Sequence, residues 1–155
     1  MPNYCRNYLT ITGDLEELKR FECNAKSKDG DSEVLSFDAL CSDWYKGESF
    51  GTRREPCETS SFWEDDALVY SFDTASCSIS RDGFMKIISD YPTLHFELLF
   101  AERGMSFLGK YTNDECWSVH SRIIAKTAEE LQDQNGNDEL FEEYKEWEDL
   151  WNSSG

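Results

Sequence analysis

The residues with the clearest chemical character lie at positions 138–149, where carboxylates are dense. This stretch holds seven acidic side chains and a single basic one, Lys145. On a helix that rises ~1.5 Å per residue, the net charge is one negative unit per roughly 2.8 Å. One DNA strand carries a charge per about 3.4 Å along its axis. The stretch therefore predicts a surface that recognises a basic partner through charge.

Residues 138–151 are expected to form that helix, because Asn137 is a good N-cap and the acidic residues after it suit the positive end of the helix dipole. Four apolar side chains recur at steps of four, three and four and form one stripe: Leu140, Tyr144, Trp147 and Trp151. Two interpretations stay open. The helix either packs on its own domain as a solvated amphipathic helix, or it is an interaction surface.

In the second interpretation, the partner-binding residues are the carboxylates of the exposed side, with two tryptophans as hydrophobic anchors. The carboxylates are Asp138, Glu139, Glu142, Glu143, Glu146 and Asp149, and the anchors are Trp147 and Trp151.

A second group of polar residues defines an alternative ligand site. Asp73 and Thr74 lie near the end of a predicted strand, and Glu102 and Gly104 lie in a later segment whose glycines let a backbone approach a ligand. A small-ligand or accessory enzyme module would need a concave pocket there. The competing interpretation is a turn followed by a bend in a strand, because no phosphate-binding loop pattern is present.

No catalytic motif accompanies these groups. Asp65, Asp66 and Asp73 could offer oxygens to a divalent ion, but an acidic run of this kind is more typical of a solvated turn. No motif places a Ser or Cys beside His95, so a structural histidine is expected. We therefore expect no catalytic residues, no metal and no cofactor, and a protein that is not an enzyme.

Composition limits the classes of partner. The chain has 155 residues, enough for one domain with a small addition, and its 32 acidic and 15 basic side chains give a net charge of −17. Such a charge repels phosphate backbones and anionic lipids, so we expect no direct nucleic-acid binding and no membrane association. An aromatic content of 14% argues against a disordered chain.

The cysteines and the N-terminal residues indicate the cytoplasm. The six cysteines have wide spacings and include no C-x-x-C pair, so free thiols are expected, mostly buried as small hydrophobic residues. The first residues lack the basic and apolar regions of a signal peptide. No apolar run approaches ~18 residues, the length that a membrane-spanning helix needs.

Apolar periodicity predicts the elements that position these groups. Alternation in the first predicted strand places Cys5, Leu9 and Ile11 on a buried face. Asp14 is the expected N-cap of the first helix, with Glu17 at the capping-box position. The predicted strands cover 4–12, 67–75, 94–100, 105–111 and 116–124, and the predicted helices begin at Asp14, Ser80, Thr127 and Asn137.

The order of these elements predicts an α+β fold, a ferredoxin-like split βαβ with an antiparallel sheet and helices on one face. Residues 1–112 would form this domain. Residues 113–155 would add a hairpin extension through Asn113-Asp114 and the acidic C-terminal helix, packed on the domain or projecting from it. Residues 42–66 show no clear pattern.

Four segments, in order along the chain, carry a family resemblance. Residues 2–13 (PNYCRNYLTITG) fit the pattern P-N-x-C-x-N-x-L-x-x-x-G, and residues 50–53 (FGTR) are similar to a W-G-T-K element with Phe for Trp. The other two are FDTA at 72–75, followed by Tyr91, Pro92, Leu94 and Phe96, and ERGMSFLG at 102–109. Together these segments resemble the YubB-type ferredoxin-like proteins of plasmids and phages. Residues 76–80 (SCSIS) depart from that family, which commonly has a Trp and prolines there.

The resemblance implies a ferredoxin-like fold and a mobile-element origin, and it carries no catalytic residues to this chain. Combined with the charge, it predicts a non-enzymatic binding protein in the cytoplasm of a host cell. Its acidic, nucleic-acid-mimicking surface would meet a basic host protein, itself a nucleic-acid-binding one, such as a component of CRISPR or restriction defence. A homo-oligomeric scaffold that pairs its tails or its sheet edges is a third hypothesis.

Overall fold

The structure is a computed structural model, and it describes residues 4–27, 33–41, 54–102 and 107–120. The elements in chain order are β1 (Tyr4–Gly13), α1 (Leu15–Ala25), α2 (Phe37–Leu40), β2 (Cys57–Glu64), β3 (Ala67–Ala75), α3 (Arg81–Asp90), β4 (Leu94–Glu102), β5 (Phe107–Thr112) and β6 (Cys116–His120). Among these elements, no helix has both the length and the apolar character needed to cross a bilayer.

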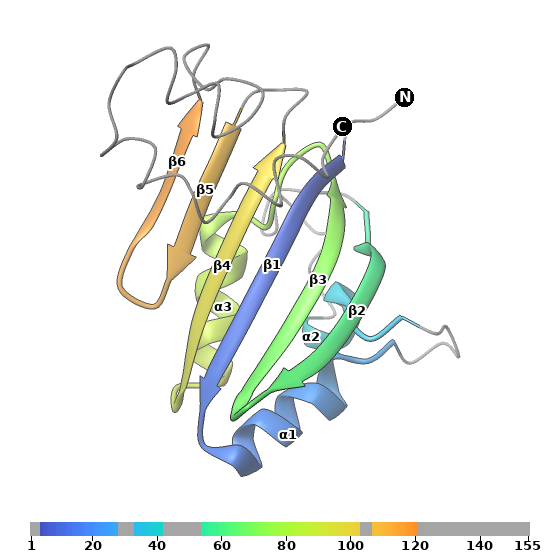
Figure 1. Cartoon of the computed structure of the whole chain (residues 1–155), viewed down its shortest axis with the longest axis vertical. Coiled ribbons are helices and arrows are strands. Elements are labelled where there is room, and N and C mark those ends of the chain that lie inside the picture. Colours follow the sequence, from blue (N-terminus) through green and yellow to red (C-terminus); the bar gives the residue numbers. More distant parts are fainter. Residues whose placement is uncertain (1–3, 28–32, 42–53, 103–106, 121–155) are drawn as a thin grey trace.

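The six strands form one sheet in the order β2-β3-β1-β4-β5-β6, and every neighbouring pair is antiparallel. Strand β1 lies at the centre, between β3 and β4 (Figure 1). The three helices lie on one face of the sheet, behind β1, β3 and β4 in the view of Figure 1. The chain is therefore a mixed α+β protein, as the element order predicted.

The core lies between the sheet and the helices. The odd positions of β1 face it, and Cys5, Leu9 and Ile11 are all buried, which confirms the predicted alternation. Phe21 of α1 packs its ring edge-on against Phe96 of β4, with 5.7 Å between the ring centroids. Such tilted aromatic pairs stabilise a core beyond the area that they bury.

The helix ends follow the predicted signals. The Asp14 carboxylate accepts a hydrogen bond from the Glu17 amide at 3.2 Å, which confirms it as the N-cap of α1. The Ser80 hydroxyl caps α3 in the same way and accepts from the Gly83 amide at 3.1 Å. Helix α3 ends at Asp90, two residues before Pro92, because proline cannot continue a helix.

Two elements lie where the sequence shows no clear pattern. Strand β2 occupies 57–64, and the short helix α2 occupies 37–40, where the sequence shows only an apolar stretch. Glu55 joins the two regions, because its carboxylate accepts from the Ser36 hydroxyl at 2.6 Å and from the Phe37 amide at 2.7 Å. Strand β2 escapes prediction because it is an edge strand whose side chains are all at least partly exposed.

The hairpin through Asn113-Asp114 is confirmed, because β5 and β6 pair antiparallel from Phe107↔His120 to Tyr111↔Cys116. Strand β5 is described from Phe107, and the two earlier residues of the predicted strand, 105 and 106, lie outside the described residues. The predicted continuation of the last strand to 124 and the helices expected after it lie outside the described residues.

Candidate functional site

The principal predicted site lies outside the described residues. This holds for all of its carboxylates, for both anchors and for one residue of the alternative site. They are Asp138, Glu139, Glu142, Glu143, Glu146, Asp149, Trp147, Trp151 and Gly104. The remaining residues of the alternative site, Asp73, Thr74 and Glu102, are described.

The structure divides the alternative site between the two faces of the sheet. Asp73 and Thr74 are consecutive residues of β3, so their side chains point to opposite faces. Asp73 lies on the face without helices, whereas Thr74 is buried on the helix side. Glu102 is also buried, and its register near Cys5 brings it to the same end of the sheet as Thr74.

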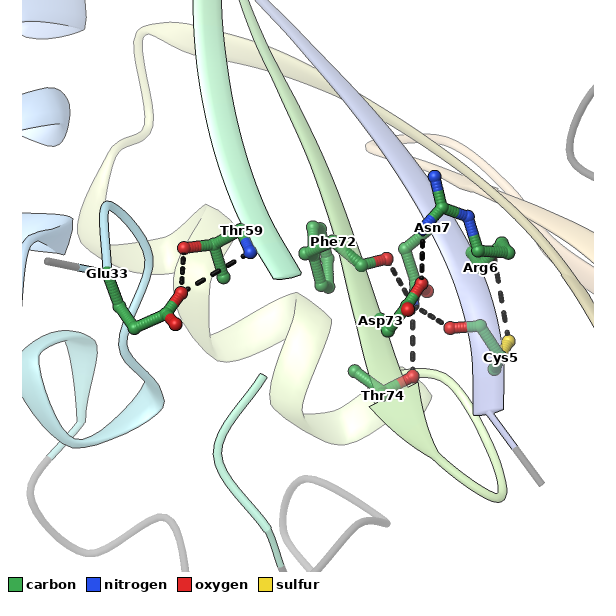
Figure 2. A network of polar contacts seen from close by, with 8 residues as sticks. All are labelled: Cys5, Arg6, Asn7, Glu33, Thr59, Phe72, Asp73 and Thr74. Carbon is green, nitrogen blue, oxygen red and sulfur yellow. Dashed lines mark hydrogen bonds and ion pairs between the residues drawn. The ribbon is translucent and has the colours of Figure 1, made fainter. Parts of the chain in front are cut away.

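A buried polar cluster surrounds Thr74, and it consists of Asn7, Thr74 and Ser78. The Asn7 amide nitrogen donates to the Thr74 hydroxyl at 3.0 Å, to the Cys5 carbonyl at 3.0 Å and to the Phe72 carbonyl at 3.4 Å (Figure 2). The Ser78 hydroxyl donates to the Asn7 amide oxygen at 2.5 Å. The Asn7 side chain of β1 thus links β1 through hydrogen bonds to β3 and to the loop that follows β3.

The chemistry of this cluster indicates a structural role. The Asn7 amide is neutral and takes up no proton, so it activates neither hydroxyl as a nucleophile. Burial raises the pKa of the nearby Cys5 thiol strongly, which keeps it protonated and unreactive. The sequence contained a signal for this cluster, because Asn7 is the polar residue on the otherwise apolar face of β1.

Asp73 forms an ion pair across the other face. The Arg6 guanidinium (Nη1) lies 2.8 Å from a carboxylate oxygen of Asp73 (Oδ1), and β1 and β3 place these two residues directly opposite each other. Burial raises the pKa of the Asp73 carboxyl, and the charge and hydrogen bond of Arg6 oppose that shift. The Arg6 Nε is buried and has no hydrogen-bond partner among the described residues.

Gly109 of β5 has a packing role. A Cβ at Gly109 would lie 2.3 Å from the Phe100 ring and 2.6 Å from the Trp117 carbonyl oxygen. The missing side chain therefore lets the Phe100 ring of β4 lie over β5, and the space that a ligand would use is filled. This geometry favours the interpretation of a strand feature over that of a ligand cradle.

The three acidic residues considered for a divalent ion do not converge, because Asp73 lies far from Asp65 and Asp66. Asp65 and Asp66 form the β2–β3 turn and, with Glu64, line an open hollow beside Thr12 and Gly13. Asp73 lies at the other end of β3, about 23 Å from Asp66 at ~3.3 Å per residue. Within the described ranges, no group of three or more His, Cys, Asp or Glu side chains could hold a metal ion.

The six cysteines are free, but the expectation that most are buried is wrong. Only Cys5 is fully buried, Cys23 is exposed, and the other four are partly exposed. Cys57 and Cys116 lie on strands near the edges of the sheet, where neighbouring side chains cover them incompletely. Burial still raises the pKa of both thiols.

Comparisons of the chain with protein-family models, with curated proteins and with solved structures find no match.

Proposed function

We propose that this chain is a non-enzymatic binding protein of a phage or plasmid, and that it presents an acidic, nucleic-acid-mimicking surface to a basic host protein. The observation that carries the proposal is the density of carboxylates at 138–149, which exceeds the charge density of one DNA strand. The resemblance to the YubB-type proteins supports the mobile-element origin.

A ferredoxin-like core is part of the proposal. Its support is the connection order β1, α1, β2, β3, α3, β4, with the short helix α2 inserted between α1 and β2, together with the spatial order β2-β3-β1-β4. These orders correspond to two interleaved βαβ units whose helices share one face. Strands β5 and β6 then extend the sheet beyond β4.

The charge of the described residues supports an acidic binding protein. They carry 18 acidic and 8 basic side chains, so the negative surplus extends beyond 138–149. Arg6 and Arg20 already contact Asp73 and Glu17 at 2.8 and 2.9 Å, and Lys110 lies 3.9 Å from Glu97. These bases are engaged locally, which leaves the remaining carboxylates to attract an external cation.

The partner class follows from this charge. A protein groove that binds nucleic acid is lined with Lys and Arg, and a dense row of carboxylates competes for it by charge. A nuclease or effector of CRISPR or restriction defence has such a groove. Occupying it would block the enzyme without any catalysis by this chain.

The test is affinity capture from the host with wild-type protein and with a variant carrying Glu142→Gln, Glu143→Gln, Glu146→Gln and Asp149→Asn. We expect the variant to lose at least tenfold of each specifically captured nucleic-acid-binding protein, and a DNA duplex to compete with the wild type. The matched control neutralises four exposed carboxylates elsewhere, through Glu16→Gln, Asp38→Asn, Asp82→Asn and Asp114→Asn, and should retain capture.

Salt provides the decisive readout. Charge-dependent binding weakens as salt shortens the screening length, from about 10 Å at 0.1 M to about 3 Å at 1 M. Capture that is equal at low and high salt, or equal for the two neutralised variants, would show that the carboxylates at 138–149 do not recognise the partner.

A further inference from the structure

The sheet face without helices carries a buried apolar patch, formed by Leu99, Ala101 and Leu108. These side chains are 8%, 0% and 2% exposed. The register places Ala101 directly opposite Leu108, and Leu99 lies two residues before Ala101 on β4, so the patch is continuous across β4 and β5. We call these residues the helix-free patch.

No described helix accounts for this burial. The helices α1, α2 and α3 all lie on the opposite face, where they contact the core through residues such as Phe21 and Phe84 (Figure 1). The open face of an antiparallel sheet is normally polar and solvated, whereas here Leu99 and Leu108, like Val69 of β3, are almost fully buried. A further layer on this face would explain the burial of Leu99 and Leu108.

We propose that residues 138–151 form this layer, and that the predicted helix docks its apolar stripe of Leu140, Tyr144, Trp147 and Trp151 on the helix-free patch. The inference rests on the proposed function only for the role of the acidic side of the helix. It commits to one occupant, this chain's own C-terminal segment.

The length of the chain permits the docking. Strand β6 is the edge strand beside β5, so the chain leaves the described part next to the patch. The 17 residues from 121 to 137 can span up to roughly 55 Å when extended, which is more than the width of three strands at about 4.8 Å each. A helix of 14 residues is about 21 Å long, close to the ~20 Å of a six-residue strand.

Two cations flank the patch, and each already has an acidic neighbour on this face. Arg6 lies opposite Ala101 in the register and pairs with Asp73 at 2.8 Å, and Lys110 lies opposite Leu99 and 3.9 Å from Glu97. The buried Arg6 Nε has no acceptor among the described residues, and a carboxylate of the docked helix would supply one.

Docking would determine which side of the helix a partner meets. With the stripe against the sheet, most carboxylates of 138–149 point to solvent in a fixed line rather than on a free segment. A pre-ordered surface loses less conformational entropy when it binds. The docked arrangement thus deepens the proposed function by specifying the acidic side of the helix as the partner surface.

The test is zero-length carbodiimide coupling on the full chain, which joins a lysine amine to a carboxylate in direct contact. We expect coupling of Lys110 to carboxylates of 138–149 to exceed that of Lys19 and Lys86 at least tenfold. Those two lysines belong to α1 and α3, on the other face of the sheet, and both are exposed. Equal coupling of the three lysines, or none at Lys110, would overturn the proposal.

A mixture of ¹⁵N-labelled and unlabelled protein separates the possible occupants. Linked peptides of uniform label support docking within one chain. Linked peptides of mixed label would assign the patch to a second copy and would likewise overturn the proposal.

Two substitutions test the apolar contact. Leu108→Asp should reduce the Lys110 coupling at least fivefold, and Trp147→Glu should do the same from the other side without altering the sheet. Thr12→Asp, at an exposed position of the same face, should leave it unchanged. Coupling that survives both Leu108→Asp and Trp147→Glu would show that the stripe does not seat on the patch.

The outcome is independent of the partner test. If Trp147→Glu loses the Lys110 coupling but still captures the partner, the helix docks in the wild type and partner binding does not require that docking. Absence of coupling in the wild type with capture intact would overturn the docking alone. Coupling in the wild type with capture unaffected by neutralising the carboxylates would overturn the proposed function alone.

Discussion

Two buried tyrosines of the core differ in what their hydroxyl groups contact. The Tyr91 hydroxyl accepts a hydrogen bond from the Asn24 side-chain amide at 3.1 Å. The Tyr70 hydroxyl is buried and has no partner among the described residues, and burial raises its pKa. An unpaired buried hydroxyl costs free energy, whereas a paired one contributes to stability.

Tyr70→Phe should therefore leave the free energy of unfolding unchanged or raise it by up to about 1 kcal/mol. Tyr91→Phe should lower it by about 0.5–1.5 kcal/mol, because the Asn24 amide loses its acceptor. Urea unfolding of the two variants measures both effects with matched chemistry. A larger loss for Tyr70→Phe than for Tyr91→Phe would mean that the Tyr70 hydroxyl has a partner after all.

The Arg6–Asp73 pair makes a prediction about pH. Burial raises the pKa of the Asp73 carboxyl and Arg6 opposes this, so Arg6→Gln should raise that pKa further. At a pH between its two pKa values, a carboxyl whose pKa is higher in the folded state is protonated in the folded protein and charged in the unfolded chain. Its contribution to stability is thus lost as pH rises from about 4, the ordinary Asp value, through the folded-state pKa.

Arg6→Gln should accordingly cost little at pH 4 and about 1–3 kcal/mol at pH 7, where Asp73 is charged and has lost its partner. Chemical unfolding of wild type and variant across this range gives the difference. Adding Asp73→Asn to Arg6→Gln should abolish the pH dependence of that difference. If Arg6→Gln lowers the free energy of unfolding equally at both pH values, the loss comes from packing of the aliphatic part of the Arg6 side chain instead.

At the level of elements, regular apolar periodicity distinguishes the strands and helices that the sequence predicts from those that it does not. Strands β1, β3 and β4 alternate or run apolar because they are central and bury at least one face. Strand β2 is at the edge, and Phe62 and Trp63 are 44% and 39% exposed, so its two faces differ little. The short helix α2 depends on a distant carboxylate, that of Glu55.

Gly109 in β5 is the element-scale position most sensitive to a single methyl group. Gly109→Ala should lower the free energy of unfolding by about 1–3 kcal/mol, because the added Cβ overlaps the Phe100 ring and the Trp117 carbonyl oxygen and forces both to move. Thermal unfolding measures the loss. Lys110→Ala, one residue along the same strand, is the control and should lower the free energy of unfolding less. If Lys110→Ala costs more than Gly109→Ala, β4 and β5 separate to admit the methyl group.

At the scale of the whole molecule, the net charge of −17 opposes folding, because the folded state brings the carboxylates closer together. Raising NaCl from about 10 mM to about 500 mM shortens the screening length from roughly 30 Å to roughly 4 Å. The Tm at pH 7 should rise by several degrees. The variant neutralised at Glu142, Glu143, Glu146 and Asp149 should rise less, and a Tm that falls with salt would show that attractive pairs dominate instead.

The candidate sites were predictable to different degrees. The carboxylate stretch at 138–149 is visible in the sequence alone, because charge density is a property of composition and spacing. The alternative site was assembled from neighbours in sequence, Asp73 and Thr74, which the pleat of β3 sends to opposite faces. The Asn7 cluster joins positions 71 residues apart, and only strand pairing brings Asn7 to Ser78.

The sequence by itself determined the net charge, the α+β class and the N-terminal ends of α1 and α3, because these depend on composition, on local periodicity and on capping side chains a few residues away. Only the tertiary structure decided the strand order, the place of β2, the pairing of Arg6 with Asp73 and the burial of Leu99 and Leu108 on a face without helices. Those features depend on which strand becomes central and on what covers each face, and both are set by contacts between residues far apart in the chain.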